Sequence, residues 1–164
     1  MTQHTETETR RRSGSITDAM VRFFTEDEWV FYRDEGEPIL QMGFKGKSGN
    51  WTCYAQALDD SRRFIFVSVM ESSVPEDKRL AIAEFLTRVN YALFLGSFEM
   101  DFSDGEVRYK TAMAVEDGEL TQAMIKKMVY ANVMSMDRYL PGIMSVIYGG
   151  ASPADALAHI EQKE

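Results

Sequence analysis

The stretch SFEMDFSDGEVRYK, residues 97–110, contains the carboxylates Glu99, Asp101, Asp104 and Glu106. Converging carboxylates can bind a metal ion, and a carboxyl group with a raised pKa can act as a general acid. The first role needs oxygen ligands with no cation already among them, and the second needs burial or a neighbouring like charge. The arrangement of the two halves of this segment therefore decides whether it is a site.

The residues at 104–105, Asp-Gly, predict a two-residue hairpin loop, because a type I′ turn needs positive φ at both positions. In that register Asp101 faces Arg108 and Glu99 faces Lys110, while the apolar side chains point to the other face. Directly opposed unlike charges add roughly 0.2–1 kcal/mol. We therefore interpret the segment as a solvated, salt-bridged sheet face, and a catalytic role for it is the weaker alternative.

Other reactive residues are isolated in the sequence. Cys53 lies in a predicted strand with no histidine nearby to activate it, and His4 and His159 stand near opposite termini, which argues against a zinc site. The run GFKGKSG, residues 43–49, lacks the full phosphate-loop spacing and is followed by a predicted strand, so it indicates a hairpin turn. We expect no catalytic residue, no metal and no cofactor.

Composition sets the class of the protein. The chain has 164 residues, 45% hydrophobic and 27% charged, which is typical of one soluble globular domain. Its net charge is −8, which disfavours nucleic acid and acidic membranes as partners and favours a basic partner surface. No run of about 18 apolar residues predicts a membrane span. With a single cysteine and no apolar signal segment, we expect a cytoplasmic protein.

Local patterns predict an α+β fold, an antiparallel β-sheet meander with helices packed on it, in the order α-β-β-β-β-α-β-β-α-α. Residues 1–14 have no apolar side chain after Met1 and are predicted to form a disordered leader, so that a single domain spans 15–164. The expected helices begin near Ile16, Pro75, Leu120 and Pro153. The expected strands cover 29–33, 38–46, 51–58 and 62–70, followed by the hairpin of 97–110.

The predicted helix from Leu120 to Tyr148 is the most informative element. Apolar residues cover most of its circumference, so it must bury two faces, one on the sheet and the other on a second helix, a second subunit or a ligand. Methionine suits adaptable contact surfaces because it is unbranched and polarizable. A Met-rich core is the equally weighted alternative. The candidate protein-interaction surface consists of Met124, Met128, Met134, Met136 and Met144.

Two segments of the chain resemble a known family. They are VPEDKRLAIAEFLTRVNYALFLGSFEMDFSDGEVRYKTAM, which begins at Val74, and MDRYLPGIMSVIYGGASPADAL, which begins at Met136. Both look like the YbjN-like family of bacterial proteins, which are described as sensory transduction regulators. The resemblance implies a fold like that of type III secretion chaperones, often dimeric, and it carries no catalytic residues over to this chain.

Together these features predict a non-enzymatic protein-binding module, chaperone-like or regulatory, that acts as a homodimer on an unidentified polypeptide partner. One alternative is a small-molecule enzyme that uses carboxylates such as Glu71, Glu99 or Asp101. Another is a structural subunit of a larger assembly. A shared fold does not by itself establish a shared function.

Overall fold

The helices and strands follow the predicted order, which confirms the α+β class. The computed structural model describes residues 14–162, so the predicted leader lies outside the described residues except for its last residue. The elements are α2 (Ile16–Glu26), β1 (Phe31–Tyr32), β2 (Ile39–Lys45), β3 (Asn50–Leu58), β4 (Arg63–Val69), a 3₁₀ turn (Glu76–Lys78), α3 (Arg79–Ala92), β5 (Ser97–Met100), β6 (Val107–Ala114), α4 (Gln122–Tyr148) and α5 (Pro153–Glu161).

Polar side chains define where the helices begin. Ser15, Thr121 and Ser152 each accept a hydrogen bond from the backbone N–H three residues later, at the starts of α2, α4 and α5. Each cap satisfies a donor that has no partner within its helix, which typically contributes about 1 kcal/mol. At α2 the carboxylate of Asp59, in the β3–β4 turn, also accepts from the N–H of Ile16 at 2.6 Å. This contact ties the first turn of α2 to the sheet.

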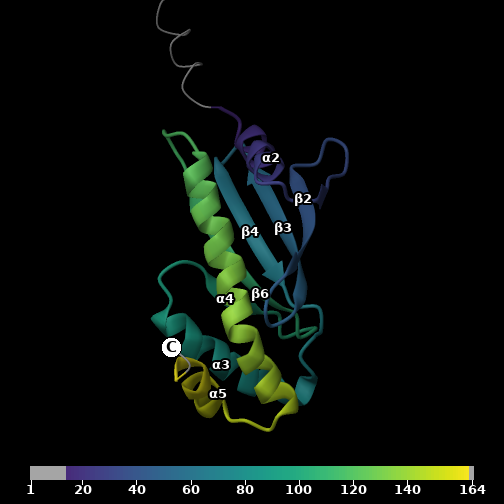
Figure 1. Ribbon diagram of the computed structural model, residues 1–164, viewed down its shortest axis with the longest axis vertical. Coiled ribbons are helices and arrows are strands. Elements are labelled where there is room, and N and C mark those ends of the chain that lie inside the picture. Colours follow the sequence, from purple (N-terminus) through teal and green to yellow (C-terminus); the bar gives the residue numbers. More distant parts are fainter. Residues whose placement is uncertain (1–13, 163–164) are drawn as a thin grey trace, which may run out of the picture.

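The six strands form one antiparallel sheet in the order β1-β2-β3-β4-β6-β5. Strands β1 to β4 make the predicted meander, β6 pairs with β4, and β5 lies at the edge. Figure 1 shows α4 running along the sheet, with α2 near one end of it and α3 and α5 together at the other. The helices therefore form a single layer, and the core lies between that layer and the sheet.

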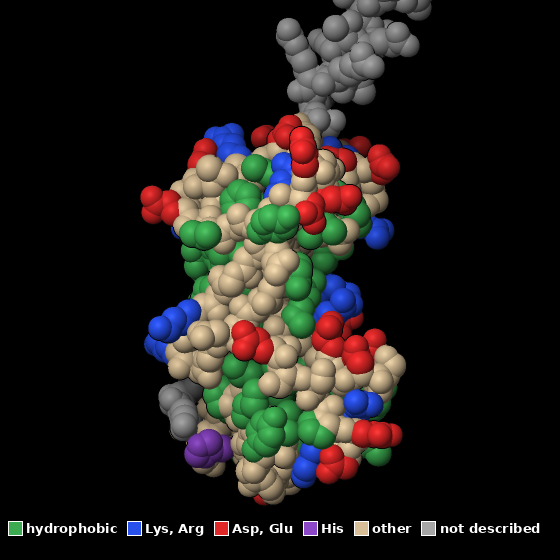
Figure 2. All heavy atoms as spheres, turned by 90° about the vertical axis from the view of Figure 1, so that its right-hand side faces the viewer, with side chains coloured by type: hydrophobic (Ala, Val, Ile, Leu, Met, Phe, Trp, Pro, Cys, Tyr) green, Lys and Arg blue, Asp and Glu red, His purple; other side chains and the backbone are tan. Residues whose placement is uncertain are grey.

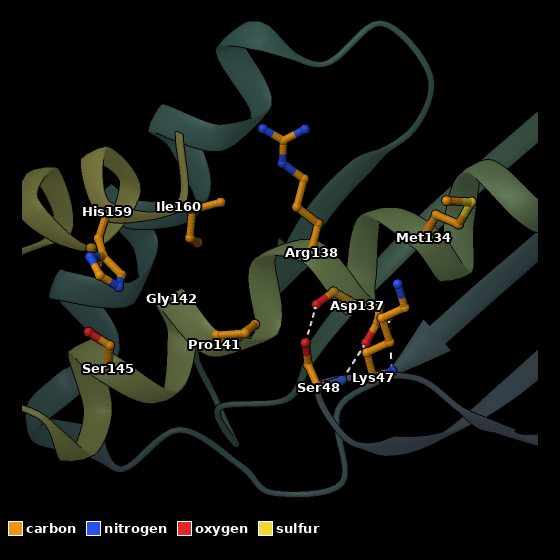
Figure 3. A pocket seen from close by; sticks show the side chains of 11 residues that line it. Lys47, Ser48, Met134, Asp137, Arg138, Pro141, Gly142, Ser145, His159 and Ile160 are labelled. Atoms are coloured by element: carbon orange, nitrogen blue, oxygen red, sulfur yellow. Dashed lines mark hydrogen bonds between the residues drawn. The ribbon is translucent and has the colours of Figure 1, made fainter. Parts of the chain in front are cut away.

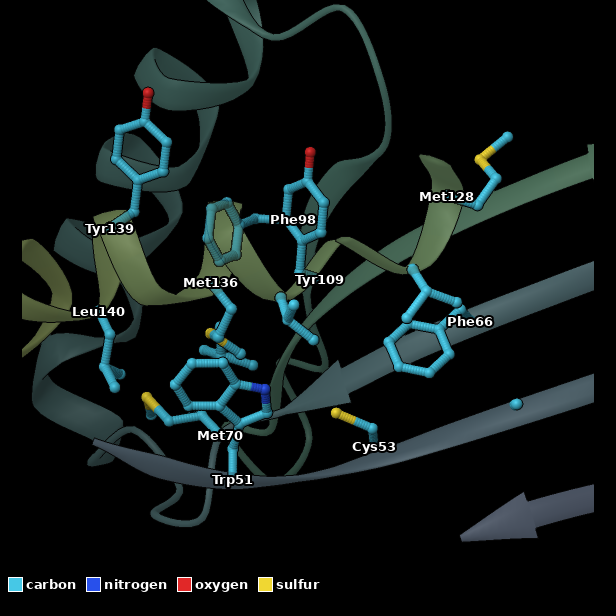
Figure 4. Packing of buried hydrophobic residues seen from close by; sticks show 14 of the residues in the cluster. Trp51, Cys53, Phe66, Met70, Phe98, Tyr109, Met128, Met136, Tyr139 and Leu140 are labelled. Atoms are coloured by element: carbon cyan, nitrogen blue, oxygen red, sulfur yellow. The ribbon is translucent and has the colours of Figure 1, made fainter. Parts of the chain in front are cut away.

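Aromatic contacts show which face of the sheet meets the helices. Phe66 on β4 stacks on Phe24 of α2 with ring centroids 5.9 Å apart, and Phe98 on β5 meets Tyr139 of α4 edge-on at 6.0 Å. Because strand side chains alternate, every second residue of each central strand joins this core. Figure 4 shows part of the packing, with Trp51 and Met136 between helix α4 and the sheet.

The opposite face of the sheet has no described helix packed on it. The side chains that alternate with the core residues of β4 are Ile65, Val67 and Val69, all half-buried. Val67 lies between Tyr54 of β3, which is 38% exposed, and Lys110 of β6. We call Tyr54, Ile65, Val67 and Val69 the open sheet face. An antiparallel sheet usually presents polar residues on its uncovered face, so this apolar strip is a candidate contact surface.

A polar network lies buried beneath α4. Asn132 is completely buried, and its amide donates to the backbone carbonyls of Phe66 at 2.9 Å and Tyr109 at 3.0 Å. Its Oδ1 accepts from the hydroxyl of Ser68 at 2.6 Å, and the Ser68 Oγ in turn accepts from the indole N–H of Trp51 at 3.0 Å. These bonds fix one rotation and one height of the helix on the sheet, because a buried amide must satisfy its donors and acceptor.

The second face of α4 is covered by α3 and α5, so one of the expected partners, a second helix, is found within the chain. The closest approach is at Gly142. A Cβ there would lie 2.5 Å from the Phe85 ring of α3 and 2.7 Å from Ile160 of α5. Glycine is therefore required where the three helices meet. The apolar circumference of α4 is explained mainly by packing inside the chain.

The hairpin of residues 97–110 differs in register from the prediction. Glu99 lies opposite Arg108 and Met100 lies opposite Val107, so the two strands are offset by two residues and residues 101–106 form the loop. Only Gly105 has positive φ in this loop, at 79°, which excludes the predicted type I′ turn. The register differs from the prediction because of a tertiary contact of the loop. Gly105 packs so closely on Val74 that a Cβ would lie 2.2 Å from the Val74 carbonyl oxygen, and its own carbonyl accepts from Val74 N–H at 2.8 Å.

Candidate protein-binding surface

A groove lies between α4, α5 and the β2–β3 turn, and Figure 3 shows its lining. We call it the α4–α5 groove. Its volume is about 500 Å³, within the range typical of ligand sites. Lys47 and Ser48 come from the turn, Met134 to Ser145 from one side of α4, and Ala156 to Ile160 from α5. The lining residues are Lys47, Ser48, Met134, Asp137, Arg138, Pro141, Gly142, Ser145, Ala156, His159 and Ile160.

Asp137 holds the β2–β3 turn against α4. Its carboxylate accepts from the backbone N–H of Lys47 at 3.0 Å and of Ser48 at 2.8 Å, and the Ser48 hydroxyl donates to the Asp137 carbonyl at 2.7 Å. Gly46 is needed here because a Cβ would lie 2.4 Å from the Asp137 carboxylate. These amides are engaged by the protein's own carboxylate, in agreement with a hairpin turn rather than a phosphate-binding loop.

The groove also brings together basic side chains from three separate elements. Lys47 lies on the turn, Arg138 on α4 and His159 on α5. The Arg138 guanidinium lies 5.3 Å from the centroid of the Tyr139 ring, a cation–π distance. In Figure 2 the one histidine among the described residues lies near the lower end of the molecule, and acidic side chains are present at both ends of this face.

The five predicted methionines occupy different environments. Met128 and Met136 are buried in the core, and Met124 and Met144 are half-buried against it. Met134 is 67% exposed and lines the α4–α5 groove. Within the folded chain, Met134 is therefore the member of the predicted surface that is most available to a partner.

The carboxylates considered for catalysis are dispersed or paired. Oε1 of Glu99 lies 3.0 Å from the Lys110 ammonium and 3.3 Å from the Arg108 guanidinium, so two cations neutralise it. Asp101 is exposed, and hydrogen bonds from the hydroxyl and backbone N–H of Ser103 hold its pKa below the usual range. Within residues 14–162, no group of three or more His, Cys, Asp and Glu side chains could hold a metal ion.

Cys53 is completely buried on β3, and its sulfur lies 3.4 Å from the Ser68 hydroxyl. Burial raises the pKa of the thiol to about 11. At neutral pH the thiol is protonated and shielded from reagents, which suits a packing role and not a nucleophile.

Sequence similarity identifies the family. The YbjN family, described as "Putative bacterial sensory transduction regulator", matches residues 17–144. The chain belongs to the YbjN family. The match extends from α2 to the region of α4 that lines the groove, and it confirms the resemblance seen in the two segments. A search of curated proteins found no match.

One solved structure supports the fold of this YbjN-family chain, and a second is reported beside it as similar. The crystal structure of YbjN, "a putative transcription regulator from E. coli", is similar over 89% of this chain and 96% of that chain, with 12% identity and a TM-score of 0.56. A chain of the HopA1–SchA chaperone–effector complex is similar over 74% of this chain and 88% of that chain, with 14% identity and a TM-score of 0.47. At these identities the likeness concerns the fold. No helix within the described residues is long and apolar enough to span a membrane.

Sequence reasoning found Met134 but not the groove that contains it. Lys47 and His159 are separated by most of the chain and meet only through the packing of the β2–β3 turn and α5 on α4. The available signal was Asp137, the one carboxylate in α4, which lies among apolar residues in the middle of the helix. A carboxylate at such a position usually has a partner, and here the partner is a turn about 90 residues earlier.

Proposed function

We propose that this YbjN-family protein is a non-enzymatic polypeptide-binding protein, chaperone-like or regulatory, that acts as a homodimer in the cytoplasm. The observation that carries the proposal is the α4–α5 groove with Met134 exposed at its wall. An exposed, adaptable methionine beside an apolar cavity suits the reception of partner side chains. The net charge of −8 disfavours nucleic acid as the partner.

We propose that the two subunits of the homodimer meet through the open sheet face. Ile65, Val67 and Val69 form an apolar strip along β4 that no described helix covers. The free edge of β5 is less suitable for self-pairing, because the Asn90 side chain accepts from Phe98 N–H at 2.8 Å and donates to its carbonyl at 3.0 Å. This amide occupies the backbone groups that an added strand would use. A two-fold contact through the sheet face would place the same strip against itself.

The partner-binding role is tested by affinity capture from the native host with wild-type protein, Met134→Asp and the matched control Leu80→Asp. Leu80 is 80% exposed on α3 and lies outside the groove, so both substitutions should leave the fold intact. We expect one recurrent polypeptide, identified by mass spectrometry, with wild type and Leu80→Asp and its loss with Met134→Asp. Equal recovery with all three proteins would contradict a role for the groove.

The homodimer is tested by light scattering at micromolar concentration. We expect twice the chain mass of 18.7 kDa for wild type and the chain mass for Val67→Glu. Val67 faces Lys110 across the strand pair, so a glutamate there gains an opposite charge within the monomer but places a carboxylate in the interface. Thr87→Glu on the exposed side of α3 is the control. A monomeric wild type would remove the dimer from the proposal, and a dimeric Val67→Glu would move the interface elsewhere.

A further inference from the structure

We propose that Gly43 is an interface residue of the homodimer, and that the depression around it receives the long side chains of β6 from a second copy of the chain. This inference rests on the proposed homodimer through the open sheet face, and it specifies how the two copies are oriented. Three observations support it: a glycine that the single chain does not require, a depression beside that glycine, and the area that a stable dimer needs.

Gly43 is the one glycine in the strands of residues 14–162, and the single chain does not explain it. Its φ lies outside the left-handed region, and a Cβ there would meet nothing within 4 Å. At Gly46 and Gly142, in contrast, a Cβ would lie 2.4 Å and 2.5 Å from another side chain. A glycine weakens a strand, and inside one it often marks the close approach of another molecule. The need for glycine at this position therefore lies outside the single chain.

A depression of about 340 Å³ surrounds Gly43 on the uncovered side of β1 and β2. Val30 and Tyr32 form its outer rim, and they are 91% and 64% exposed. Thr52 lies opposite Gly43 on β3 and also lines the depression, and Val69 of the open sheet face lies opposite Thr52 on β4. The depression is therefore continuous with the open sheet face.

The area that a stable dimer needs extends the contact over this depression. A standard interface buries about 800 Å² on each partner. With strands about 4.8 Å apart and about 3.3 Å per residue, β4 and its partner residues on β3 present only about 200 Å² of flat sheet. A contact confined to the open sheet face is too small, so it must spread to β2 on one side and to β6 on the other.

A two-fold axis in the plane of the contact can run across the strands or along them. An axis across the strands stacks β2 on β2, so that the two depressions face each other and leave an unfilled space, which well-packed interfaces lack. An axis along the strands, above the β3–β4 boundary, stacks β2 on β6, because these strands flank β3 and β4 in the sheet. The second orientation fills both depressions.

In that orientation the side chains of Arg108 and Lys110 on β6 meet the depression of the other copy. Arg108 lies in the same row of the sheet as Gly43, and a rotation about the strand direction keeps each row over itself. The ion pairs of Arg108 and Lys110 with Glu99, at 3.3 Å and 3.0 Å, remain in place, because the contact uses the aliphatic stems. The bare backbone of Gly43 leaves room for these stems.

The role of Gly43 is tested with Gly43→Val, and Thr87→Val on the exposed side of α3 is the control. Valine at position 43 has free space in the single chain and favours a strand, so the urea midpoint, measured below the Kd of the dimer, should equal or exceed that of wild type. In the dimer the added side chain occupies the depression. Sedimentation equilibrium should therefore show a Kd at least about tenfold higher than for wild type, because overpacking a close contact is unfavourable. The Kd of Thr87→Val should match that of wild type.

The orientation is tested with Gln41→Cys on β2 and Ala112→Cys on β6, two exposed positions on the uncovered side of the sheet. A tagged sample of one variant is mixed with an untagged sample of the other and treated with a short bifunctional maleimide. The native Cys53 is completely buried and does not react. We expect a cross-link between the two variants in the mixture and little cross-linking in either variant alone.

The outcomes separate this inference from the proposed homodimer. A wild type that is monomeric at micromolar concentration would overturn both. A dimer in which Gln41→Cys cross-links to itself would leave the homodimer standing and overturn the orientation. The expected cross-link together with an unchanged Kd for Gly43→Val would overturn the role of Gly43. A lower urea midpoint for Gly43→Val would also overturn that role, because it would show that the single chain itself requires the glycine.

Discussion

Replacing Asn132 should destabilise the protein far more than any surface change on α4. The Asn132 side chain makes direct hydrogen bonds to the Phe66 carbonyl, the Tyr109 carbonyl and the Ser68 hydroxyl at 2.6–3.0 Å, and it is completely buried. Asn132→Ala removes these bonds and leaves Ser68 with only Trp51 and Cys53 as neighbours in the network.

The expected cost follows from the number of bonds. Each buried hydrogen bond contributes about 0.5–1.5 kcal/mol net, and the Ser68 hydroxyl loses its acceptor in an apolar surrounding. The free energy of unfolding should therefore fall by about 2–4 kcal/mol. A change of this size is a large part of the total stability of a domain, which is typically about 5–15 kcal/mol.

Urea denaturation followed by tryptophan fluorescence measures the effect, and Trp51 reports on the network directly because its indole N–H binds Ser68. With a slope of about 2 kcal/mol per molar urea, typical of a small domain, the midpoint should fall by about 1–2 M. Asn50→Ala, at an exposed strand position, should change stability by less than about 0.5 kcal/mol. If Asn132→Ala behaves like this control, the network does not hold α4 on the sheet and the reasoning is refuted.

Three further changes test other parts of the structure. Burial raises the pKa of Cys53 from 9.0 to about 11, so the stability that the neutral thiol contributes is complete below pH 9.0 and is lost as pH rises toward 11. Urea denaturation should show that Cys53→Ala loses less stability than wild type over this pH range, by up to about 2–3 kcal/mol. Parallel curves of stability against pH for the two proteins would contradict this. A double-mutant cycle of Glu99→Ala and Arg108→Ala should give a favourable coupling below about 1 kcal/mol, since the pair is partly exposed, and zero coupling would show that the ion pair contributes nothing. Gly46→Ala should cost about 1–2 kcal/mol because its Cβ displaces Asp137 from the turn, and an unchanged urea midpoint would mean that the turn relaxes freely.

The order and type of the elements could be predicted because they depend on local patterns. Ser15 and Ser152 cap the helices that periodicity placed there, and the strands after residue 38 lie where β-branched and aromatic residues alternate. The first strand is shorter than predicted. Trp29 N–H bonds back to Phe24, and Glu28 takes positive φ, so the chain leaves α2 through a turn before pairing begins.

The hairpin register could not be predicted because Gly105 is required by a tertiary contact and not by the type of turn. Asp104 and Gly105 match the preferred type I′ sequence, yet the glycine is needed where the loop meets Val74 from a separate segment. Glu99 still pairs with Lys110 as expected, and it also takes Arg108, the cation that was assigned to Asp101. Local turn preferences are weak enough that one close tertiary contact can override them.

The sequence alone determined which residues form helices and strands and which of their faces are apolar. It also determined that α4 must bury two faces. These properties depend on hydrophobic periodicity and charge, which are set by residues that are close together along the chain. Only the tertiary structure decided that α3 and α5 cover the second face of α4, that Met134 stays exposed while Met128 and Met136 do not, and that Asn132 finds its partners in the sheet. It also decided that Lys47 and His159 line one groove. These outcomes depend on contacts between residues far apart in the chain, and such contacts produce no periodic pattern in a single sequence.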